Sequence, residues 1–395
     1  MHSEEMQSAL YQALDMMNAR NVREFAVPPA TFMGPGAVAR CGEALLERGI
    51  YRPFVMVDSM LHQAGMTDVL ERNLKRSGIT YEIWPCSPGE PVDSDIGAAV
   101  EQIGRCQCDG VIALGGGSVL DAAKVVAVIA TNPALALESM VAGTRLNRRL
   151  PFIAIPTTSG TGSEATNVAV IIAAQTHRKQ VLVHTMLIPD VAIIDACLTL
   201  GVPPHITAAT GIDALTHAIE AYVASNGTPL TRGLAYRAIN SIGHALPQAV
   251  GQGHDLAARE AMMLASYMAG MAFSNAGLGL CHASAHQIGA AYGIPHGKAN
   301  AIMLPGVMKF NQLVCKTAYS EIGHALTGKS CAASETIAFV EHLIDELELG
   351  SGLRAAGGCD SDFIGFARAA LNDICITTNP RTVTEAQIIT LYQDA

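Results

Sequence analysis

The stretch VIALGGGSVLDAAK, residues 111–124, joins a short apolar run to a helical pattern through three consecutive glycines. The run from Val111 to Leu114 is typical of a buried strand, and the glycines leave backbone amides bare where the helix begins. Such amides and the helix dipole can hold a phosphate. Ser118 and Asp121 have the spacing of a capping box for that helix. Because the stretch lacks the GxGxxG fingerprint, it does not predict a standard Rossmann domain, and taken alone it is equally a tight turn.

Similar strand and helix patterns alternate on both sides of this stretch, from Phe54 to about Asp195. Helical patterns such as residues 93–106 separate the apolar runs. This alternation is typical of α/β proteins and predicts a doubly wound, largely parallel sheet that helices cover on both faces. The predicted strands are FVMV (54–57), ITYEIW (79–84), GVIAL (110–114), FIAI (152–155), VAVII (168–172) and VAIID (191–195).

The pattern changes near Val202–Pro204, where strand-like runs end and long helical stretches rich in Ala, Leu and Met begin. A chain of 395 residues is long for one core, so we expect two domains with a cleft between them. The expected division is an amphipathic amino-terminal extension over residues 1–22, an α/β dinucleotide-binding domain over 23–202, and an all-helical metal-binding and catalytic domain over 203–395.

Composition excludes several classes of function. Half of the residues are hydrophobic, yet no apolar run reaches the ~18 residues that a membrane span needs, and the acidic residues near Met1 argue against a secretory signal. The formal charge of −10 offers no basic surface for nucleic acid. Ten cysteines without a CxxC pair predict reduced thiols and a cytoplasmic protein.

A second polar segment, PTTSGTGSEAT at residues 156–166, also follows a predicted strand and collects hydroxyls and backbone amides. Two such loops at the carboxyl ends of parallel strands are where open α/β sheets bind nucleotides. Asp58 closes the strand FVMV, where a carboxylate can accept hydrogen bonds from ribose hydroxyls and repel a 2′-phosphate. We therefore expect NAD rather than NADP, although a single acid at a strand end is more often an ordinary surface residue.

Five side chains in the helical half have spacings that suit a metal site. Asp213 and His217 are four residues apart, as are His282 and His286, so each pair lies on one helical face. His296 follows in a predicted turn. One carboxylate and up to four imidazoles suit Fe²⁺, Zn²⁺, Ni²⁺ or Mn²⁺, and the spacing does not decide which histidines bind.

These motifs together resemble the iron-dependent alcohol dehydrogenases, and the resemblance extends from about Arg23 to Ala395. It rests on GGGSVLDAAK, PTTSGTGSEAT, PDVAIID, TAATGIDALTHAIEAY, GLCHASAHQIGA, PHGKAN and the closing TNPR. The resemblance implies a fold similar to dehydroquinate synthase, a nucleotide and a metal in the cleft, and hydride transfer between NAD(H) and a small primary alcohol or aldehyde. It also implies one divalent metal per chain, Fe²⁺ with Zn²⁺ as the alternative.

The resemblance assigns roles to particular residues. It places the metal on Asp213, His217, His282 and His296 and leaves His286 beside the site, where we expect it to relay a proton. It places Phe273 and Cys375 near the substrate. The nucleotide contacts that it implies are Asp58, Gly116, Gly117, Ser118, Asp121, Thr157, Thr158, Thr161 and Lys179. The chain departs from the family at SPGEP, residues 87–91, and at Ala173 and Ala174, which leaves the shape of the cofactor loop open.

Within the family, the chain resembles the alcohol dehydrogenases of bacterial ethanolamine utilisation, and this resemblance implies reduction of acetaldehyde to ethanol. Enzymes of such pathways are packaged in protein-shelled microcompartments by short amphipathic tails. In residues 1–20, Met6, Leu10, Leu14 and Met17 have helical spacing, so we expect them to bind a shell or core protein. A helix that packs on its own enzyme or on a second subunit of a homo-oligomer, expected to be a dimer, is the alternative.

Three other functions remain open at this stage. Two are variants of the same fold, a zinc-dependent polyol dehydrogenase of the glycerol type and a dehydroquinate-synthase-like lyase. The third is a catalytically silent microcompartment scaffold. The complete set of one aspartate and three histidines argues against the first two, and the intact metal and nucleotide motifs argue against the scaffold, since a scaffold needs neither.

Overall fold

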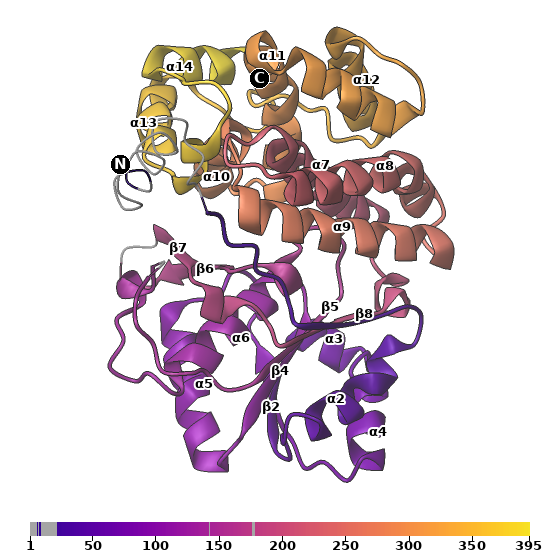
Figure 1. Cartoon of the computed structure of the whole chain (residues 1–395), viewed down its shortest axis with the longest axis vertical. Coiled ribbons are helices and arrows are strands. Elements are labelled where there is room, and N and C mark those ends of the chain that lie inside the picture. Colours follow the sequence, from indigo (N-terminus) through magenta and orange to yellow (C-terminus); the bar gives the residue numbers. More distant parts are fainter. Residues whose placement is uncertain (1–5, 7, 9–21, 142, 176–177) are drawn as a thin grey trace.

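The computed structural model describes residues 6, 8, 22–141, 143–175 and 178–395. The predicted amino-terminal helix therefore lies outside the described residues. Figure 1 shows two stacked parts, a sheet with its helices below and a group of helices above. None of the helices among the described residues is both long and apolar enough to cross a membrane.

The lower part is built on a six-stranded sheet in the order β1-β8-β5-β4-β2-β3, in which all neighbouring strands are parallel. Strand order reverses between β2 and β4, so their carboxyl ends form the switch point at which such sheets bind ligands. Asp58 ends β2 and Gly115 ends β4. The strands are β1 (Ala30–Met33), β2 (Pro53–Asp58), β3 (Glu82–Cys86), β4 (Gly110–Gly115), β5 (Phe152–Pro156) and β8 (Val191–Ile194).

Helices cover both faces of this sheet, which confirms the doubly wound fold. Alternate residues of β4 point to opposite faces of the sheet. Val111 packs on one face with α5 (Asp93–Cys106) and α6 (Gly117–Ile129). Ile112 packs on the other face with α2 (Cys41–Leu46) and α4 (Asp68–Arg76). Since both faces are buried, β2, β4, β5 and β8 are continuous apolar runs. The short helix α3 (Ser59–Gln63) follows β2.

One predicted strand is not part of the six-stranded sheet. The run VAVII forms β6 (Val168–Ala173), which pairs antiparallel with β7 (Arg178–Val183) in a separate two-stranded ribbon. Its burial alternates along the strand, as expected for a strand with one covered face, whereas the strands of the main sheet are buried throughout. The sequence patterns did not predict β1 or β7.

The upper part of the chain is helical, as predicted, and its first helix begins at Pro204. The helices are α7 (Pro204–Val223), α8 (Pro229–Gly251), α9 (Leu256–Ala276), α10 (Leu280–Tyr292), α11 (His296–Thr327), α12 (Ala333–Glu346), α13 (Asp360–Leu371) and α14 (Glu385–Asp394). A single cluster of buried side chains runs through all of them. Helix α7 is buried over most of its length, so the side chains it carries are largely shielded from water.

The two parts meet through close backbone contacts and through an amino-terminal strap, the segment of residues 22–29 that precedes β1. The loop after β5 lies against α9, where Gly162 and Gly270 approach so closely that a Cβ on Gly270 would lie 2.6 Å from the Gly162 carbonyl oxygen. The segment from Val22 to β1 runs from the helical part down to the sheet, as the indigo chain in Figure 1 shows. Along it, the Ala26 N–H donates to Asn275 Oδ1 on α9 at 2.8 Å. These contacts fix the position of the nucleotide loops relative to the helices above them.

Candidate metal centre

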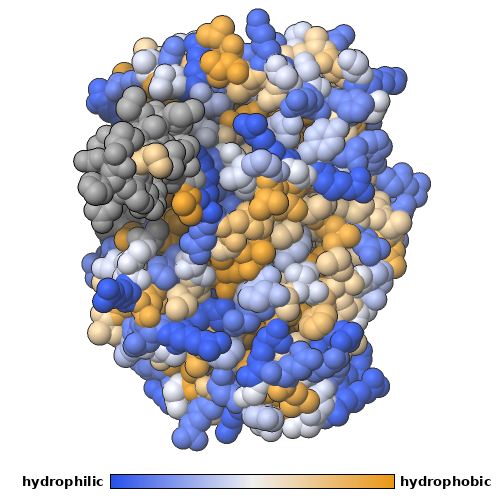
Figure 2. Space-filling model, viewed as in Figure 1, coloured by the Kyte–Doolittle hydropathy of each residue, from blue (hydrophilic) through white to orange (hydrophobic). Residues whose placement is uncertain are grey.

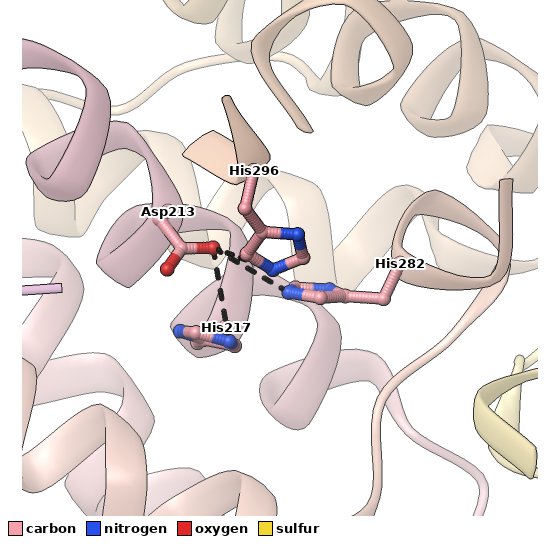
Figure 3. Close-up of side chains that lie close together, drawn as sticks. All are labelled: Asp213, His217, His282 and His296. Atoms are coloured by element: carbon pink, nitrogen blue, oxygen red, sulfur yellow. Dashed lines mark ion pairs between the residues drawn. The ribbon is translucent and has the colours of Figure 1, made fainter. Parts of the chain in front are cut away.

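Four buried or half-buried side chains converge in the helical part, close to the junction with the sheet (Figure 3). Asp213 Oδ1 lies 3.8 Å from His217 Nε2, 3.6 Å from His282 Nε2 and 3.4 Å from His296 Nε2. The four donor atoms lie within 4.8 Å of one another. The structure therefore brings together the four side chains that the family resemblance implies as metal ligands.

Three helices supply these side chains. Asp213 and His217 are one turn apart on α7, so both point to the same side of that helix. His282 lies in the first turn of α10. The turn expected at His296 is wrong, because His296 is the first residue of α11, with Pro295 as its N-cap. Three rigid helices therefore hold the donor atoms.

Burial and mutual charge determine the protonation of these groups. Burial raises the pKa of Asp213, but the surrounding histidines lower it by a larger amount. The pKa of Asp213 therefore lies well below its usual range. Burial lowers the pKa of His217 to about 4 and that of His296 to about 3, against the attraction of Asp213. At neutral pH the aspartate is therefore ionised and these two imidazoles keep free lone pairs, as metal ligands require.

His282 has a different environment because a second carboxylate contacts it. Glu220 Oε2 lies 2.6 Å from His282 Nδ1, and Glu220 Oε1 accepts from the Cys281 N–H at 2.7 Å. Burial lowers the pKa of His282, but hydrogen bonds to Asp213 and Glu220 raise it to about 9. A carboxylate on the second ring nitrogen of a metal-binding histidine orients the ring and makes it a stronger ligand.

The donor set suits a divalent cation. Three imidazole nitrogens and one carboxylate oxygen point into one small space, and the Glu220 carboxyl group contacts the second ring nitrogen of His282. Such a nitrogen and oxygen site without a thiolate is appropriate for Fe²⁺ or Zn²⁺. The stacking of His217 on His282, with ring centroids 4.5 Å apart, further restricts ring rotation.

His286 lies beside this cluster rather than in it. Its ring stacks on His296 with centroids 5.5 Å apart, and its Nδ1 lies 2.8 Å from Asp373 Oδ2. Asp373 also accepts from the Cys375 N–H at 2.9 Å, so Cys375 lies in the same group. The Phe273 ring stacks on His217 with centroids 4.4 Å apart. Phe273 therefore contacts the four-residue cluster, whereas Cys375 belongs to the neighbouring group of His286 and Asp373.

The two polar loops expected to bind a nucleotide are in contact. A Cβ on Gly116 would lie 3.7 Å from Thr158 Oγ1, and a Cβ on Gly117 would lie 2.7 Å from Thr161 Cγ2. Thr157 is buried at the end of β5. Helix α6 begins at Gly117 with Gly116 as its N-cap, and this glycine has no side chain to cap the first amides. That end of the helix can therefore accept a phosphate.

The capping box predicted for Ser118 and Asp121 is wrong. Asp121 Oδ1 accepts from the Ser163 hydroxyl at 2.6 Å, and Oδ2 accepts from the Val170 N–H at 2.9 Å. The carboxylate is used to hold the second loop and β6, because these segments fold back over α6. Asp121 thus joins the two loops instead of closing its own helix.

Asp58 and Lys179 have partners within the chain. Asp58 Oδ1 accepts from the N–H groups of Met60 and Leu61, so Asp58 is the N-cap of α3. Lys179 on β7 forms an ion pair with Glu90, which belongs to the divergent SPGEP segment. The segment in which the chain departs from the family pattern therefore contacts Lys179.

Three functional candidates were not found from the sequence. Glu220 is seven residues after Asp213, so helical periodicity could have placed it on the same face of α7. Asn300 is one turn after His296 in α11 and could have been found in the same way. Asp373 is 87 residues from His286, and no local pattern relates the two.

The chain belongs to the iron-containing alcohol dehydrogenases. Residues 28–196 match the family described as iron-containing alcohol dehydrogenase, and residues 207–395 match its carboxyl-terminal domain. It is therefore an oxidoreductase that acts on CH–OH groups and has an Asp/His metal site.

Its relatives include the protein named "Probable alcohol dehydrogenase EutG" of Salmonella typhimurium, which is 58% identical over 391 residues, 99% of each chain. The alcohol dehydrogenase of Oenococcus oeni has a similar structure, with a TM-score of 0.92 and 33% identity over 95% of this chain and all of that one. A sulfoacetaldehyde reductase of Bifidobacterium kashiwanohense, solved with NAD⁺, has a TM-score of 0.86 and 26% identity over 94% of this chain and 98% of that one.

Proposed function

We propose that this chain is an NAD(H)-linked dehydrogenase that interconverts a small primary alcohol and its aldehyde at a divalent metal held by Asp213, His217, His282 and His296. The convergence of these four donor atoms within 4.8 Å is the observation that carries the proposal. A divalent ion there supplies Lewis acidity toward the substrate oxygen. Fe²⁺ is the expected ion and Zn²⁺ the alternative, since the same ligands suit both.

His286 is the residue proposed to relay the hydroxyl proton. Asp373 accepts from Nδ1, which fixes the tautomer and leaves Nε2 free to exchange a proton with the substrate or with water. Because the ring stacks on His296, it lies beside the proposed ligands without being one of them. A packing role for His286 is the alternative that a variant must exclude.

The proposed cofactor site lies at the switch point of the sheet, on Asp58, Gly116, Gly117, Ser118, Asp121, Thr157, Thr158, Thr161 and Lys179. The Asp58 carboxylate is expected to favour NAD by repelling a 2′-phosphate. Asp58→Asn keeps an oxygen that can cap α3 but removes the charge. It should therefore raise the ratio of kcat/KM for NADPH to that for NADH above the wild-type ratio, without loss of stability. An unchanged ratio of kcat/KM for NADPH and NADH would remove Asp58 from the proposal.

Acetaldehyde is the proposed substrate, reduced to ethanol in ethanolamine catabolism. Phe273 contacts His217, Cys375 lies in the neighbouring group of His286, and both side chains are buried and uncharged, which suits a short apolar substrate. Support for the pathway comes from the similarity to the Salmonella protein. Reduction of the aldehyde by NADH would recycle NAD⁺ within a pathway that generates the aldehyde.

We further propose a cytoplasmic homodimer that enters a microcompartment through residues 1–20. Among the described residues no strand pairs with the outer edge of β1, and Met33 on this strand is exposed. Figure 2 shows apolar residues across the middle of the face that it draws. The domains proposed are the extension 1–22, the nucleotide domain 23–202 and the metal domain 203–395. The mass of the particle in solution, measured by light scattering, tests the dimer.

The function is tested by anaerobic purification with metal analysis, followed by NADH oxidation against a panel of small aldehydes. Asp213→Ala should lose the metal and the activity together. His286→Ala should keep the metal and lose about 10²-fold or more in turnover, because general acid–base catalysis contributes about that much.

Three results would contradict the proposal. Zinc as the native metal together with preferred activity on glycerol would indicate a polyol dehydrogenase. The absence of activity with any divalent metal would favour the scaffold. Full turnover of His286→Ala across the pH range would exclude the proton relay while leaving the metal assignment intact.

A further inference from the structure

The fully buried side chain of Asn300 lies among the four proposed metal ligands. Its Nδ2 atom lies 2.8 Å from Asp213 Oδ1, 3.2 Å from His282 Nε2 and 3.3 Å from His296 Nε2. Asn300 therefore approaches the ligand atoms of three different residues, which come from three helices.

The orientation of this amide follows from its neighbours. An amide nitrogen carries two hydrogens and only donates, whereas the amide oxygen only accepts. If the two atoms were exchanged, Oδ1 would face the Asp213 carboxylate and the cost of two opposed acceptors would be large, because the site is buried. The N–H to carboxylate bond is charge-assisted and is therefore among the stronger hydrogen bonds of the site.

We propose that Asn300 is a positioning residue that sets the metal affinity of this centre. Its N–H groups hold Asp213 Oδ1 at the point toward which the Nε2 atoms of His282 and His296 are directed. At His282, the contact of Glu220 with Nδ1 orients the ring and leaves Nε2 for the metal. The proposal rests on the assignment of the four side chains as metal ligands.

A buried asparagine elsewhere in the chain provides a matched control. Asn132 is 9% exposed, its Nδ2 donates to the Val128 carbonyl oxygen at 2.9 Å, and its Oδ1 accepts from the Asn147 N–H at 2.7 Å. It lies in the sheet part, away from the ligand cluster. Replacing it removes a buried amide of the same kind without touching a proposed ligand.

The test measures the affinity for Co²⁺ in competition with a coloured chelator, together with the visible absorption spectrum of the bound Co²⁺. Asn300→Leu keeps a similar volume and removes both donors. It should weaken Co²⁺ binding by about 10–100-fold, the usual cost of losing a partner of a metal ligand, and should alter the spectrum. Asn132→Leu should bind Co²⁺ within about twofold of the wild type, since it removes no such partner. Circular dichroism and thermal unfolding show that each variant is folded.

The outcomes separate the two proposals. If Asn300→Leu binds Co²⁺ as tightly as the wild type with an unchanged spectrum, or more tightly, the positioning role is wrong. If Asp213→Ala also binds like the wild type, the ligand assignment itself fails. If Asn300→Leu does not fold, Asn300→Ser and Asn132→Ser form the second pair, and the same comparison decides.

Discussion

Glu164 is a carboxylate buried in the loop that joins the two parts of the molecule, with 2% of its surface exposed. Burial raises its pKa to about 7, while its own backbone N–H and the charge of Lys124 oppose this shift. Lys124 is fully buried and donates to Thr166 Oγ1 at 2.8 Å and to the Val168 carbonyl oxygen at 2.6 Å. Burial lowers its pKa to about 8. Both charges are held beside the nucleotide loops at a cost in free energy.

Replacing Glu164 should change how stability depends on pH. Its pKa is about 7 in the native state and 4.5 ordinarily, so the native state binds more protons between these values. Stability from this group is therefore present at low pH and is lost as pH rises from about 4.5 to about 7. Glu164→Gln should remove that loss, up to roughly 3 kcal/mol, because each pKa unit corresponds to about 1.4 kcal/mol.

The measurement is the free energy of unfolding in urea at about pH 5 and about pH 8, taken as the difference between variant and wild type so that other titrating groups cancel. Glu101→Gln is the control, since Glu101 is 71% exposed on α5. An equal difference at both pH values would show that the Glu164 carboxylate is ionised throughout.

Among the elements, the closest contact lies between the loop after β5 and helix α9. Gly162 has φ +59°, a conformation that favours glycine, and a Cβ on it would lie 2.7 Å from Gly270 Cα. On α9, a Cβ on Gly270 would lie 2.6 Å from the Gly162 carbonyl oxygen, and these are backbone atoms that cannot turn aside. The two glycines therefore set the distance between the nucleotide loop and the helix that carries Phe273.

Gly270→Ala should destabilise the protein by about 1–3 kcal/mol or more, because overpacking forces the backbones apart. Gly233→Ala in α8 is the matched control, since Gly233 is exposed and has no atom within 4 Å of an added Cβ. That change should stabilise by about 0.5–1 kcal/mol through helix propensity. Thermal unfolding measures both, and equal effects of the two substitutions would contradict the contact.

Sequence periodicity predicts elements well where one rule dominates. The run from Val111 to Leu114 and the helix after it follow from burial on both faces and from the glycines. Strand β7 was missed because RKQVLV begins with polar residues and is stabilised by its pairing with β6. The assignment of β6 to the main sheet failed for the same reason, since pairing partners are a tertiary property.

In the metal site, too, local patterns predict some residues, whereas others are brought in only by the tertiary structure. The i,i+4 spacing and the family motifs together indicate Asp213, His217, His282 and His296, all of which converge in the structure. Asn300 contacts Asp213 and Asp373 contacts His286 from other elements, and no local sequence pattern predicts these two contacts. Asp373 caps the short helix Ile374–Thr378 and reaches His286 only because the chain folds back.

For the whole molecule, the amino-terminal strap links the helical part to the sheet. The Arg23 guanidinium donates to the Asn226 carbonyl oxygen at 2.6 Å and also contacts the Asn226 side chain. Asn275 contacts both backbone groups of Ala26, accepting at 2.8 Å and donating at 3.0 Å. The chain then enters β1, at the edge of the sheet. The strap thus binds the upper part before it becomes a strand of the lower one.

Two truncations separate this role from the proposed targeting role of the first residues. Deleting residues 1–20 should leave activity and melting temperature unchanged but abolish co-purification with microcompartment shells. Deleting residues 1–27 also removes the hydrogen bonds to Asn226 and Asn275, so the melting temperature should fall by roughly 2–5 °C. Asn275→Ala in the full chain should reproduce much of that fall while packaging persists. If both truncations melt alike, the strap does not stabilise the junction, and if shells still retain the shorter truncation, residues 1–20 are not the targeting segment.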